Sequence, residues 1–572
     1  MLLLQFLQEF GILNEQISEK SGKKNRCSCL RLIMYYLSLL AQGHFSELTS
    51  FFSLHYLLFF LPAALLVYSA APKSWKKYAL LLISLGFFVL VSGVLVIFLL
   101  LTVLSIWLFG QWLDAIRRQR DAAVKAAEKT QRKAIKHTYL IRSRLVLGLA
   151  AVMHIGTLLV LKYSGFFMEN VNLLFGSALP VPQFALPIGI SFFTLQAFSY
   201  LFDVYRGTLE ADRNIFRLAL FVSFFPQIVE GPICRYSQTA QALWDVKGIT
   251  YENLTFGLQR FLYGMMKKLV VADRLNAFID AVFSGYAELQ GGVIAIAAVC
   301  YTIQLYMDFS GAMDAVTGVG QIFGIVMPEN FRQPFFSRTV SEFWTRWHIS
   351  LGGWFRDYIF YPVSISKPVK NWTTAIRKRF GTHWGSVAAA GIALFCVWSC
   401  NGLWHGAAWS YIFFGMYHFT LIFTGNLAAP LTKKFHERFR IQPDSLPFRL
   451  FQTFRTCILV VIGELFFRAE GLKAGLQMFG RIVTDFRFSS VNVQLLDSLS
   501  IDVQDFLIVG VTLIIVFLVS FLKERGVNIR RTLQDKPVAL RWALLYALIF
   551  YIIIFGAYGK GYVPVNPMYA NF

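Results

Sequence analysis

A single histidine lies between two apolar segments that could each cross a membrane. His405 is part of the sequence NGLWHGAAW, and a basic segment lies on the far side of each apolar segment. We therefore expect the chain to enter the membrane, turn near Gly406 and return, with His405 at mid-depth or toward the outer side. An ionisable side chain at that depth is costly and usually faces a polar cavity or a partner. A neutral imidazole can accept a proton, as a general base must when it activates a hydroxyl.

The same histidine has a plainer interpretation. A buried histidine can simply pack and bond to a neighbouring helix, which is how we interpret His154 and His418. Asn401 precedes His405 by four residues, so the two share a helix face if the helix continues. From there its amide could orient the imidazole ring or donate a hydrogen bond to an oxyanion. The residues alone make His405 a candidate for catalysis and leave the packed alternative open.

A second histidine lies in a long stretch that contains no membrane-crossing segment. His348 belongs to FWTRWHISLGGWFRDY, within 329–383, where aromatic, basic and polar residues intermix. This composition is typical of helices in the headgroup zone, and a re-entrant element that lines a cavity has a similar composition. His348 could therefore belong to a site, or headgroups could solvate it at the interface.

Other reactive groups within apolar segments have weaker claims to chemistry. Asp308 and Asp314 flank a Ser-Gly pair in LYMDFSGAMDAVTG. They could bind a cation or form structural pairs with arginine residues, and we prefer the structural role. Cys396 and Cys400 share a helix face and are interpreted as small core residues, with a thioester-forming nucleophile as the alternative. The sequence contains no Gly-rich phosphate loop, zinc signature or G-x-S-x-G elbow.

The elements that must position these residues are membrane-spanning helices. Of the 572 residues, 56% are hydrophobic and only 15% are charged, whereas about 25% are charged in soluble domains. Apolar runs near the length of about 20 residues that a spanning helix needs recur along the chain. We predict an all-α, multi-pass protein of the cell membrane with about a dozen spans. The runs are 52–70, 79–110, 145–162, 187–202, 215–229, 254–271, 292–309, 385–403, 407–428, 451–467, 506–522 and 541–556.

The formal charge of +22 fits the positive-inside rule, because the basic residues flank apolar runs and do not gather on one face. Binding to nucleic acid is therefore not expected. The segment 113–144 holds ten Lys or Arg residues against three acidic ones and should form an exposed amphipathic helix in the cytoplasm. The rule also places 367–379, 433–440 and 523–541 in the cytoplasm and the charge-poor 166–186 outside. The alternation of loops along the chain places 469–505 outside.

The first 48 residues differ from the rest of the chain. A Leu-rich start precedes a polar middle and a short apolar piece near 28–41, which is not the order found in a signal peptide. We interpret 1–48 as an N-terminal extension that is mobile or interfacial and dispensable for activity. A single polytopic membrane domain should then occupy 49–572.

Three segments resemble one known family in their order and spacing. They are 185–236, 301–362 with LYMDFSGAMD and FWTRWHISLGGWFRDY, and 401–419 with NGLWHGAAW. In these segments the chain resembles the bacterial membrane-bound O-acyltransferases that esterify cell-surface polysaccharides. The resemblance extends from about Phe51 to the C-terminus.

This resemblance implies both a fold and a site. The family's helices form a ring around a thin central channel, with interfacial and re-entrant helices, where a cytoplasmic thioester donor meets an acceptor from outside. Its near-invariant histidine, found in an LWHG sequence, matches His405, and its second histidine matches His348. His405 would then deprotonate the acceptor hydroxyl, while His348 and Asn401 position or polarise the thioester. Further contacts with substrate are expected from Trp404, Trp344, Asp308 and Arg356.

The expected reaction moves an acyl group, acetyl by default, from a thioester of coenzyme A or acyl carrier protein. The acceptor would be an extracytoplasmic polysaccharide or a partner transferase that acylates it. This chemistry needs proximity of the substrates, a base and exclusion of water, so no metal or bound redox cofactor is expected. Membrane lipids are expected around the protein. One alternative is a transporter or flippase, although no inverted repeat is visible. A structural scaffold, in which the histidines would be replaceable, is another.

Overall fold

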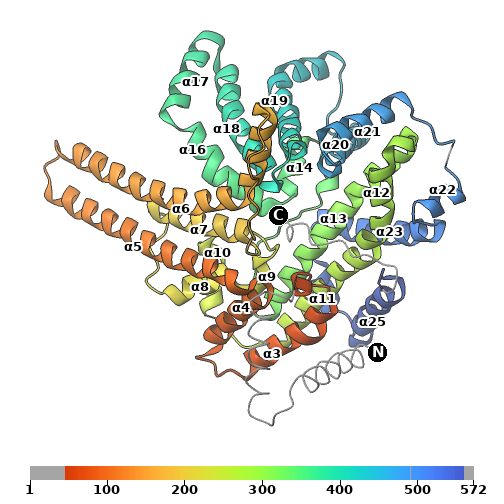
Figure 1. Cartoon of the computed structure of the whole chain (residues 1–572), viewed down its shortest axis with the longest axis horizontal. Helices are drawn as coiled ribbons and strands as arrows, with labels where there is room; N and C mark the ends of the chain where they lie inside the picture. The colour runs from red at the N-terminus through yellow and green to blue at the C-terminus, as the bar shows by residue number, and fades with distance from the viewer. Residues whose placement is uncertain (1–45, 246, 490, 559–572) are drawn as a thin grey trace.

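The computed structural model describes residues 46–558 except positions 246 and 490, and every regular element in this part of the chain is a helix. The all-α prediction is therefore confirmed. Most helices pack into one body, from which α5 (Val96–Ala126) and α6 (Arg132–Phe175) project as a pair (Figure 1). The prediction for the extension 1–48 falls almost wholly outside the described residues.

Eight helical segments in the described residues are long and apolar enough to cross a membrane, which identifies a multi-pass membrane protein. About a dozen spans were expected, and the described residues do not confirm that number. The eight are Lys76–Ala126, which joins α4 (Lys76–Ser92), η3 (Gly93–Leu95) and α5, followed by α6, α13 (Gly291–Ile322), α18 (Thr382–His405), α19 (Trp409–Arg438), α20 (Leu446–Arg468), α23 (Val503–Glu524) and α25 (Val538–Phe555).

The other four apolar runs form shorter helices. In chain order, the four runs form η2 (Tyr56–Phe60) with α3 (Leu61–Ala70), then α7 (Ile190–Arg206), then α8 (Ile215–Ser223) with α9 (Phe225–Ile228), and lastly α11 (Tyr251–Met266). Between α8 and α9 the chain leaves the helical conformation at Phe224, just before Pro226, which has no N–H to continue a helix. Most side chains of α7 and α8 are buried in the protein. Their hydrophobicity therefore fills the interior and does not mark a lipid-facing span.

The central helix of the body is α13, with 72% of its most apolar window buried. It packs closely on α11 because glycines face each other at two levels. A Cβ added at Gly257 would lie 2.5 Å from the Gly318 oxygen, and one at Gly264 would lie 2.4 Å from the Gly311 oxygen. Only glycine allows two helix backbones to approach this closely.

The two ends of α13 meet different segments. At its start, the Gly291 N–H donates to the Asp485 main-chain oxygen at 3.0 Å. Near its end, Arg530 Nη1 donates to Gln321 Oε1 at 2.8 Å. The segments 469–505 and 523–541 therefore lie at opposite ends of one spanning helix, which agrees with their predicted placement on opposite sides of the membrane.

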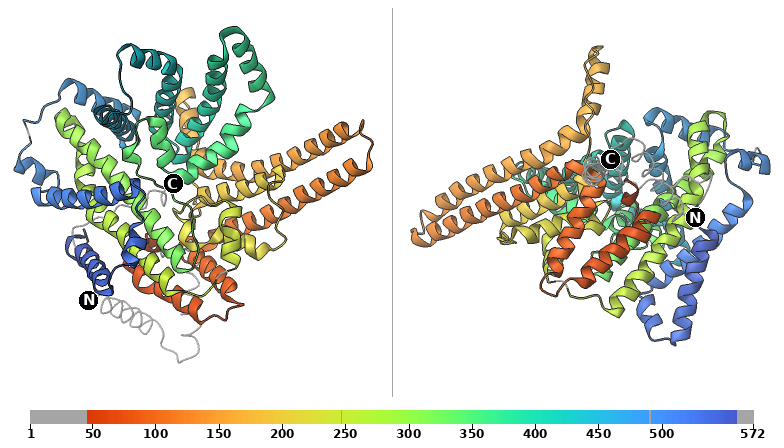
Figure 2. Two further views of the ribbon diagram at one scale, coloured as in Figure 1. Left: turned by 180° about the vertical axis from the view of Figure 1, so that it is seen from behind. Right: turned by 60° about the horizontal axis from the view of Figure 1, so that its bottom comes forward.

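The basic segment 113–144 covers the end of α5 and the start of α6, and most of its side chains are exposed. Figure 2 shows the two helices side by side as they leave the body. The exposure predicted for this segment is confirmed, but it forms a pair of helices joined at 127–131 and not one helix.

The remaining helices are short. They are η1 (Ser46–Thr49), α10 (Tyr236–Trp244), η4 (Lys267–Ala272), α12 (Asp273–Gly285), η5 (Tyr286–Glu288), η6 (Pro334–Phe336), α14 (Val340–Arg346), α15 (Ile349–Phe355), η7 (Arg356–Phe360), α16 (Tyr361–Ser364), α17 (Lys367–Phe380), α21 (Leu472–Thr484), α22 (Val493–Ser498) and α24 (Ile529–Gln534). Phe343, Trp347 and Trp354 on or beside α14 and α15 are buried. This burial favours a re-entrant element over helices that lie on the membrane surface.

Candidate functional site

His348 occupies a sharp turn between α14 and α15. Its φ of 48° lies in the left-handed region, which few residues other than glycine adopt. The side chain is buried, and its ring meets Phe309 of α13 edge-on with the centroids 4.8 Å apart. Backbone conformations of this kind cost energy and cluster at functional sites.

Asn330, for which the sequence predicts no role, holds this turn. Its Oδ1 accepts the backbone N–H of Ser350 at 3.0 Å and the Ser350 hydroxyl at 2.9 Å. The same oxygen lies 3.2 Å from His348 Nδ1. Because the Ser350 N–H can only donate, this atom of Asn330 is the acceptor oxygen, and His348 Nδ1 must carry the proton. Neutral His348 therefore has its lone pair on Nε2.

His405 is the last residue of α18, and the predicted turn at Gly406 is confirmed because α19 begins at Trp409. A side chain at position 406 would lie 2.4 Å from the ring of Tyr411, which explains the glycine. The buried imidazole contacts the rings of Phe414 and Phe467 edge-on, with centroid distances of 6.0 and 5.1 Å. Aromatic side chains therefore fix the position of this ring.

Asn401 and Trp404 lie in the last turns of α18 and are buried. Within the described residues, Asn401 Oδ1 and Trp404 Nε1 are buried atoms without a hydrogen-bond partner. The Trp404 ring packs edge-on against Phe192 at 5.6 Å, and Lys162 Nζ donates to its main-chain oxygen at 2.8 Å. A buried donor and a buried acceptor in this condition are groups that a substrate could satisfy.

The two predicted histidines come from different elements, and both are buried. Burial, and to a smaller extent the His405 imidazole, hold the pKa of His348 well below its ordinary value. Phe309, which contacts the His348 ring, belongs to the same apolar cluster as Trp404. The site at the end of α18 and the α14–α15 turn is named the histidine site. It comprises Asn330, His348, Asn401, Trp404 and His405.

Trp344 contributes mainly to packing in this region. Its Nε1 donates to His418 Nδ1 at 3.2 Å, and its ring lies 4.9 Å from that of Trp398. His418 is thus a packed histidine bonded to a neighbouring element, as predicted. The same prediction is confirmed for His154, whose Nε2 lies 3.1 Å from Ser105 Oγ. A contact between Trp344 and substrate stays a prediction.

Asp308 and Asp314 are held in buried ion pairs. Lys268 Nζ lies 2.7 Å from Asp308 Oδ1, and Lys267 Nζ lies 2.6 Å from Asp314 Oδ2. These pairs support the structural role preferred for both carboxylates, although lysine and not only arginine provides the charge. Contact between Asp308 and substrate stays a prediction. The group is named the ion-pair cluster and comprises Arg260, Lys267, Lys268, Asp273, Asp308 and Asp314.

Arg356 lies apart from the buried groups, at the start of η7. Its side chain is 61% exposed, and its Nε lies 3.0 Å from Asp357 Oδ1. A direct contact between Arg356 and substrate stays a prediction, and it would have to occur at the surface of the protein.

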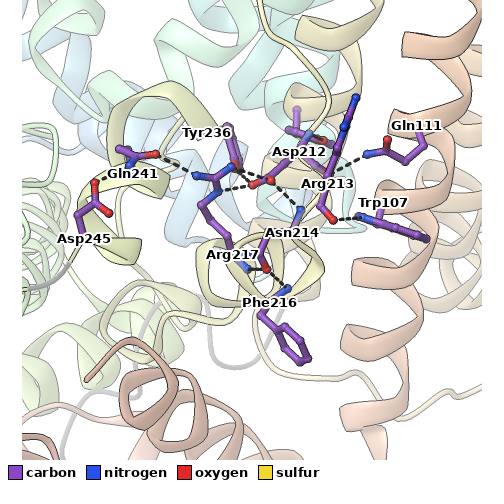
Figure 3. A network of polar contacts seen from close by, with 11 residues as sticks. Trp107, Gln111, Asp212, Arg213, Asn214, Phe216, Arg217, Tyr236, Gln241 and Asp245 are labelled. Carbon is purple, nitrogen blue, oxygen red and sulfur yellow. Dashed lines mark hydrogen bonds and ion pairs between the residues drawn. The ribbon is translucent and has the colours of Figure 1, made fainter. Parts of the chain in front are cut away.

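A further polar network fixes the segment 203–214, which interrupts the apolar pattern of the sequence. Asp212 accepts hydrogen bonds from Arg217 and Tyr236 (Figure 3). Burial opposes ionisation of Asp212, but these hydrogen bonds outweigh it and lower its pKa. Gln111 of α5 donates to the Asp212 main-chain oxygen at 2.8 Å. The network therefore anchors α5 to the body and has no direct part in the histidine site.

Comparison with known proteins finds one family. The model described as MBOAT, membrane-bound O-acyltransferase family, matches residues 208–376. The chain is 31% identical over 432 residues to the probable alginate O-acetylase AlgI of Pseudomonas aeruginosa, an alignment that covers 74% of this chain and 73% of that protein. It is 31% identical over 381 residues to the peptidoglycan O-acetyltransferase of Helicobacter pylori, covering 62% and 66%. It is also 31% identical over 254 residues to the teichoic acid D-alanyltransferase of Bacillus subtilis, covering 43% and 61%.

The matched lengths are unequal among these relatives. For several of the alginate O-acetylases, the alignment spans only 59% to 66% of the relative's own length. His348 falls inside the segment matched by the family model, whereas His405 lies C-terminal to it.

Proposed function

Because this chain belongs to the membrane-bound O-acyltransferase family, we propose that it transfers an acyl group from a cytoplasmic thioester to a hydroxyl outside the membrane. The acceptor is an extracytoplasmic polysaccharide or a partner transferase that acylates it. Acetyl is the preferred acyl group, since two of the relatives above are named as O-acetylating enzymes and one as a D-alanyltransferase. The observation that carries this proposal is the pair of buried histidines from two separate elements, with Phe309 beside His348 and Trp404 beside His405 in one apolar cluster.

In the proposed reaction, His405 takes the proton of the acceptor hydroxyl. The hydroxyl oxygen then attacks the carbonyl carbon of the thioester, a new ester C–O bond forms and the C–S bond breaks. The proton held by His405 passes to the departing thiolate, so the histidine ends the cycle neutral. The surrounding rings of Phe414 and Phe467 support this role because they keep bulk water, which would hydrolyse the donor, away from the imidazole.

His348 has one task in this proposal, and Trp404 and Asn401 share another. The hydrogen bond to Asn330 leaves His348 with an acceptor at Nε2, so the neutral ring positions a substrate N–H or O–H better than it polarises a carbonyl oxygen. Donation to the thioester oxygen then falls to Trp404 Nε1 or to the Asn401 amide. The buried indole N–H of Trp404, which has no acceptor in the described residues, supports this assignment.

We place these groups in a channel that the helices surround, with one substrate arriving from each side. The helix α18 supports this route because it starts beside the basic helix α17, contains 24 residues and ends at His405. At about 1.5 Å per residue this is roughly 36 Å, close to the thickness of the bilayer core. A donor from the side of α17 would therefore have to insert deeply to reach His405.

The proposal is tested with the purified full-length protein in nanodiscs. Acetyl coenzyme A and an acetylated carrier protein are supplied separately, and thiol release is followed with and without a soluble polysaccharide acceptor. The expected result is acceptor-dependent thiol release together with an ester on the polymer, detected by mass spectrometry. Movement of polysaccharide across sealed proteoliposomes without thiol release would support the transporter alternative and overturn the proposal.

A further inference from the structure

A cavity of about 970 Å³ lies where α11, α23, α24 and α25 meet the segment 329–333. It is distinct from the histidine site. Its walls have two kinds of side chain, and these occupy different parts of the surrounding helices. One wall is apolar and consists of Ile515 and Val519 of α23 with Leu544, Leu545 and Leu548 of α25. The other is charged and consists of Arg260, Asp314, Glu329, Arg332, Arg346, Lys523, Glu524, Arg530 and Arg541.

The charged wall carries excess positive charge. Six basic and three acidic side chains line it, which leaves a formal excess of three. All three carboxylates already have an arginine partner. Arg260 binds Asp314 at 2.8 Å and also binds Glu329. Arg346 binds Glu524 at 2.9 Å. Because Arg260 serves two of the three carboxylates, four cations of the wall remain without one. These are Arg332, Lys523, Arg530 and Arg541, and none of them has an ion pair in the described part of the chain.

Two of these four cations contact uncharged groups. Arg530 Nη1 donates to Gln321 Oε1 at 2.8 Å, and Lys523 Nζ lies 5.6 Å from the centre of the Tyr263 ring. Arg541 Nε is buried and has no hydrogen-bond partner among the described residues. A buried guanidinium nitrogen without a hydrogen-bond partner costs free energy, and a hydrogen bond from Arg541 to an anion would offset that cost.

The position of the cavity relative to the membrane indicates what kind of anion fits. Both α23 and α25 are candidate spans whose side chains are mostly exposed, with only 17% and 6% of their apolar windows buried. Lys523 lies at the end of α23, and Arg541 lies in the first turn of α25. The cations therefore lie at one membrane surface, and the apolar wall extends from them toward the bilayer interior.

We propose that this cavity binds an anionic phospholipid. Its phosphate would lie among Lys523, Arg530 and Arg541, and an acyl chain would lie against the leucines of α25. Basic pockets between spanning helices on the cytoplasmic side recognise such headgroups, and that side is the one the charge pattern assigns to 523–541. A soluble phosphate would use the cations but would leave the apolar wall without a partner.

Occupancy of the cavity should also stabilise the histidine site. Arg332 lines the cavity, and its N–H donates to the Arg346 main-chain oxygen at 2.9 Å. Two residues earlier, the Asn330 main-chain oxygen accepts the N–H of Ile349 at 2.9 Å, next to His348. A lipid that holds Arg332 would thereby order the segment that fixes the His348 turn.

The test measures binding and does not depend on acyl transfer. The full-length protein is released for native mass spectrometry from nanodiscs that contain equal parts of phosphatidylglycerol and phosphatidylcholine. We expect one phosphatidylglycerol to stay bound in preference to phosphatidylcholine. Arg541→Gln and Lys523→Gln should each weaken its retention about fivefold. The matched control is Arg531→Gln, an exposed cation of the same segment that does not line the cavity and should change nothing.

A second variant tests the apolar wall with the charges intact. Leu545→Trp should fill the space against α25 and displace the lipid while the protein still elutes as a single species. Equal retention of both lipids, or equal loss in Arg531→Gln and Arg541→Gln, would overturn the proposal. Displacement of phosphatidylglycerol by coenzyme A, with the same dependence on Arg541, would instead assign the cavity to a soluble phosphate ligand and would also overturn it.

Discussion

The histidine site and the ion-pair cluster both bury polar groups beside α13, but they satisfy those groups in opposite ways. In the ion-pair cluster, Asp273, Asp308 and Asp314 each have a cationic nitrogen within 2.9 Å. In the histidine site, Asn401 Oδ1 and Trp404 Nε1 have no hydrogen-bond partner in the described residues. A carboxylate with a cation beside it indicates a group that stabilises the fold, whereas a donor and an acceptor without partners beside a candidate base indicate where a substrate can bind.

The largest expected effect is on the rate of transfer in His405→Gln. Glutamine keeps hydrogen bonding and approximate size but cannot take the proton, so the rate should fall by about two to four orders of magnitude. Thiol release by the purified protein measures the rate, and thermal unfolding in detergent should be unchanged. The matched control is His418→Gln, because His418 also packs against Phe414. The transfer rate of His418→Gln should stay within a few-fold of the wild-type rate. A near-normal transfer rate in a folded His405→Gln protein would contradict the proposed mechanism.

In the ion-pair cluster the main effect should be on stability. Asp314→Ala leaves Arg260 and Lys267 buried without their common partner, and breaking a buried pair in this way costs about 3–5 kcal/mol. A clear drop in the unfolding midpoint is therefore expected, with transfer per folded molecule little changed. Asp314→Asn, which keeps hydrogen-bond acceptors, should lose less. If Asp314→Ala were stable but inactive, the distinction between the two regions would fail.

A smaller loss of activity is expected in Asn330→Ala. The substitution removes the acceptor that fixes Ser350 and the Nδ1–H of His348. A buried hydrogen-bonding group left without its partner costs about 1–3 kcal/mol, which corresponds to roughly five- to 150-fold in rate. Turnover should fall more than the donor KM rises, since the His348 ring loses its fixed tautomer. Unchanged turnover with a lower unfolding midpoint would assign Asn330 to the fold alone.

The pH dependence should separate positioning from packing. In the wild-type protein, burial and His405 lower the pKa of His348, so its Nε2 lone pair persists well below the ordinary histidine range. Asn330→Asp places a carboxylate beside Nδ1, which favours the charged ring and raises that pKa. The acid limb of the pH–rate profile should therefore move to higher pH. Ser350→Ala, which adds no charge, should leave the limb in place, and an unmoved limb in Asn330→Asp would exclude His348 from the titrating step.

The smallest effect is expected for Arg356→Ala. Exposed ion pairs such as the one between Arg356 and Asp357 contribute about 0–1 kcal/mol, so rate and stability should change less than about fivefold. A larger increase in the donor KM would show that the substrate contact predicted from the sequence is real. Such a result would extend the functional region from the buried histidines to the protein surface.

The sequence predicted the helical membrane fold and singled out His405 and His348, which the structure buries, because hydropathy and the setting of each histidine are local properties. The number of spans expected from the sequence is not confirmed, because an apolar run such as 215–229 can face protein as well as lipid, and only tertiary packing distinguishes the two cases. The role of Asn330 was missed for a related reason. Its contacts join residues far apart in the chain, and nothing in the surrounding sequence PENF indicates which backbone groups its amide will meet.

The left-handed backbone at His348 restricts which amino acids this position can accept during evolution or in a mutant library. Asparagine, aspartate and glycine adopt this conformation most readily, whereas β-branched residues clash with their own backbone there. A saturation library at 348 would therefore lose valine and isoleucine variants through misfolding, whatever the chemistry of the site. His348→Asn keeps both the conformation and a hydrogen-bonding side chain, so it is the replacement in which lost activity can be attributed to the imidazole itself.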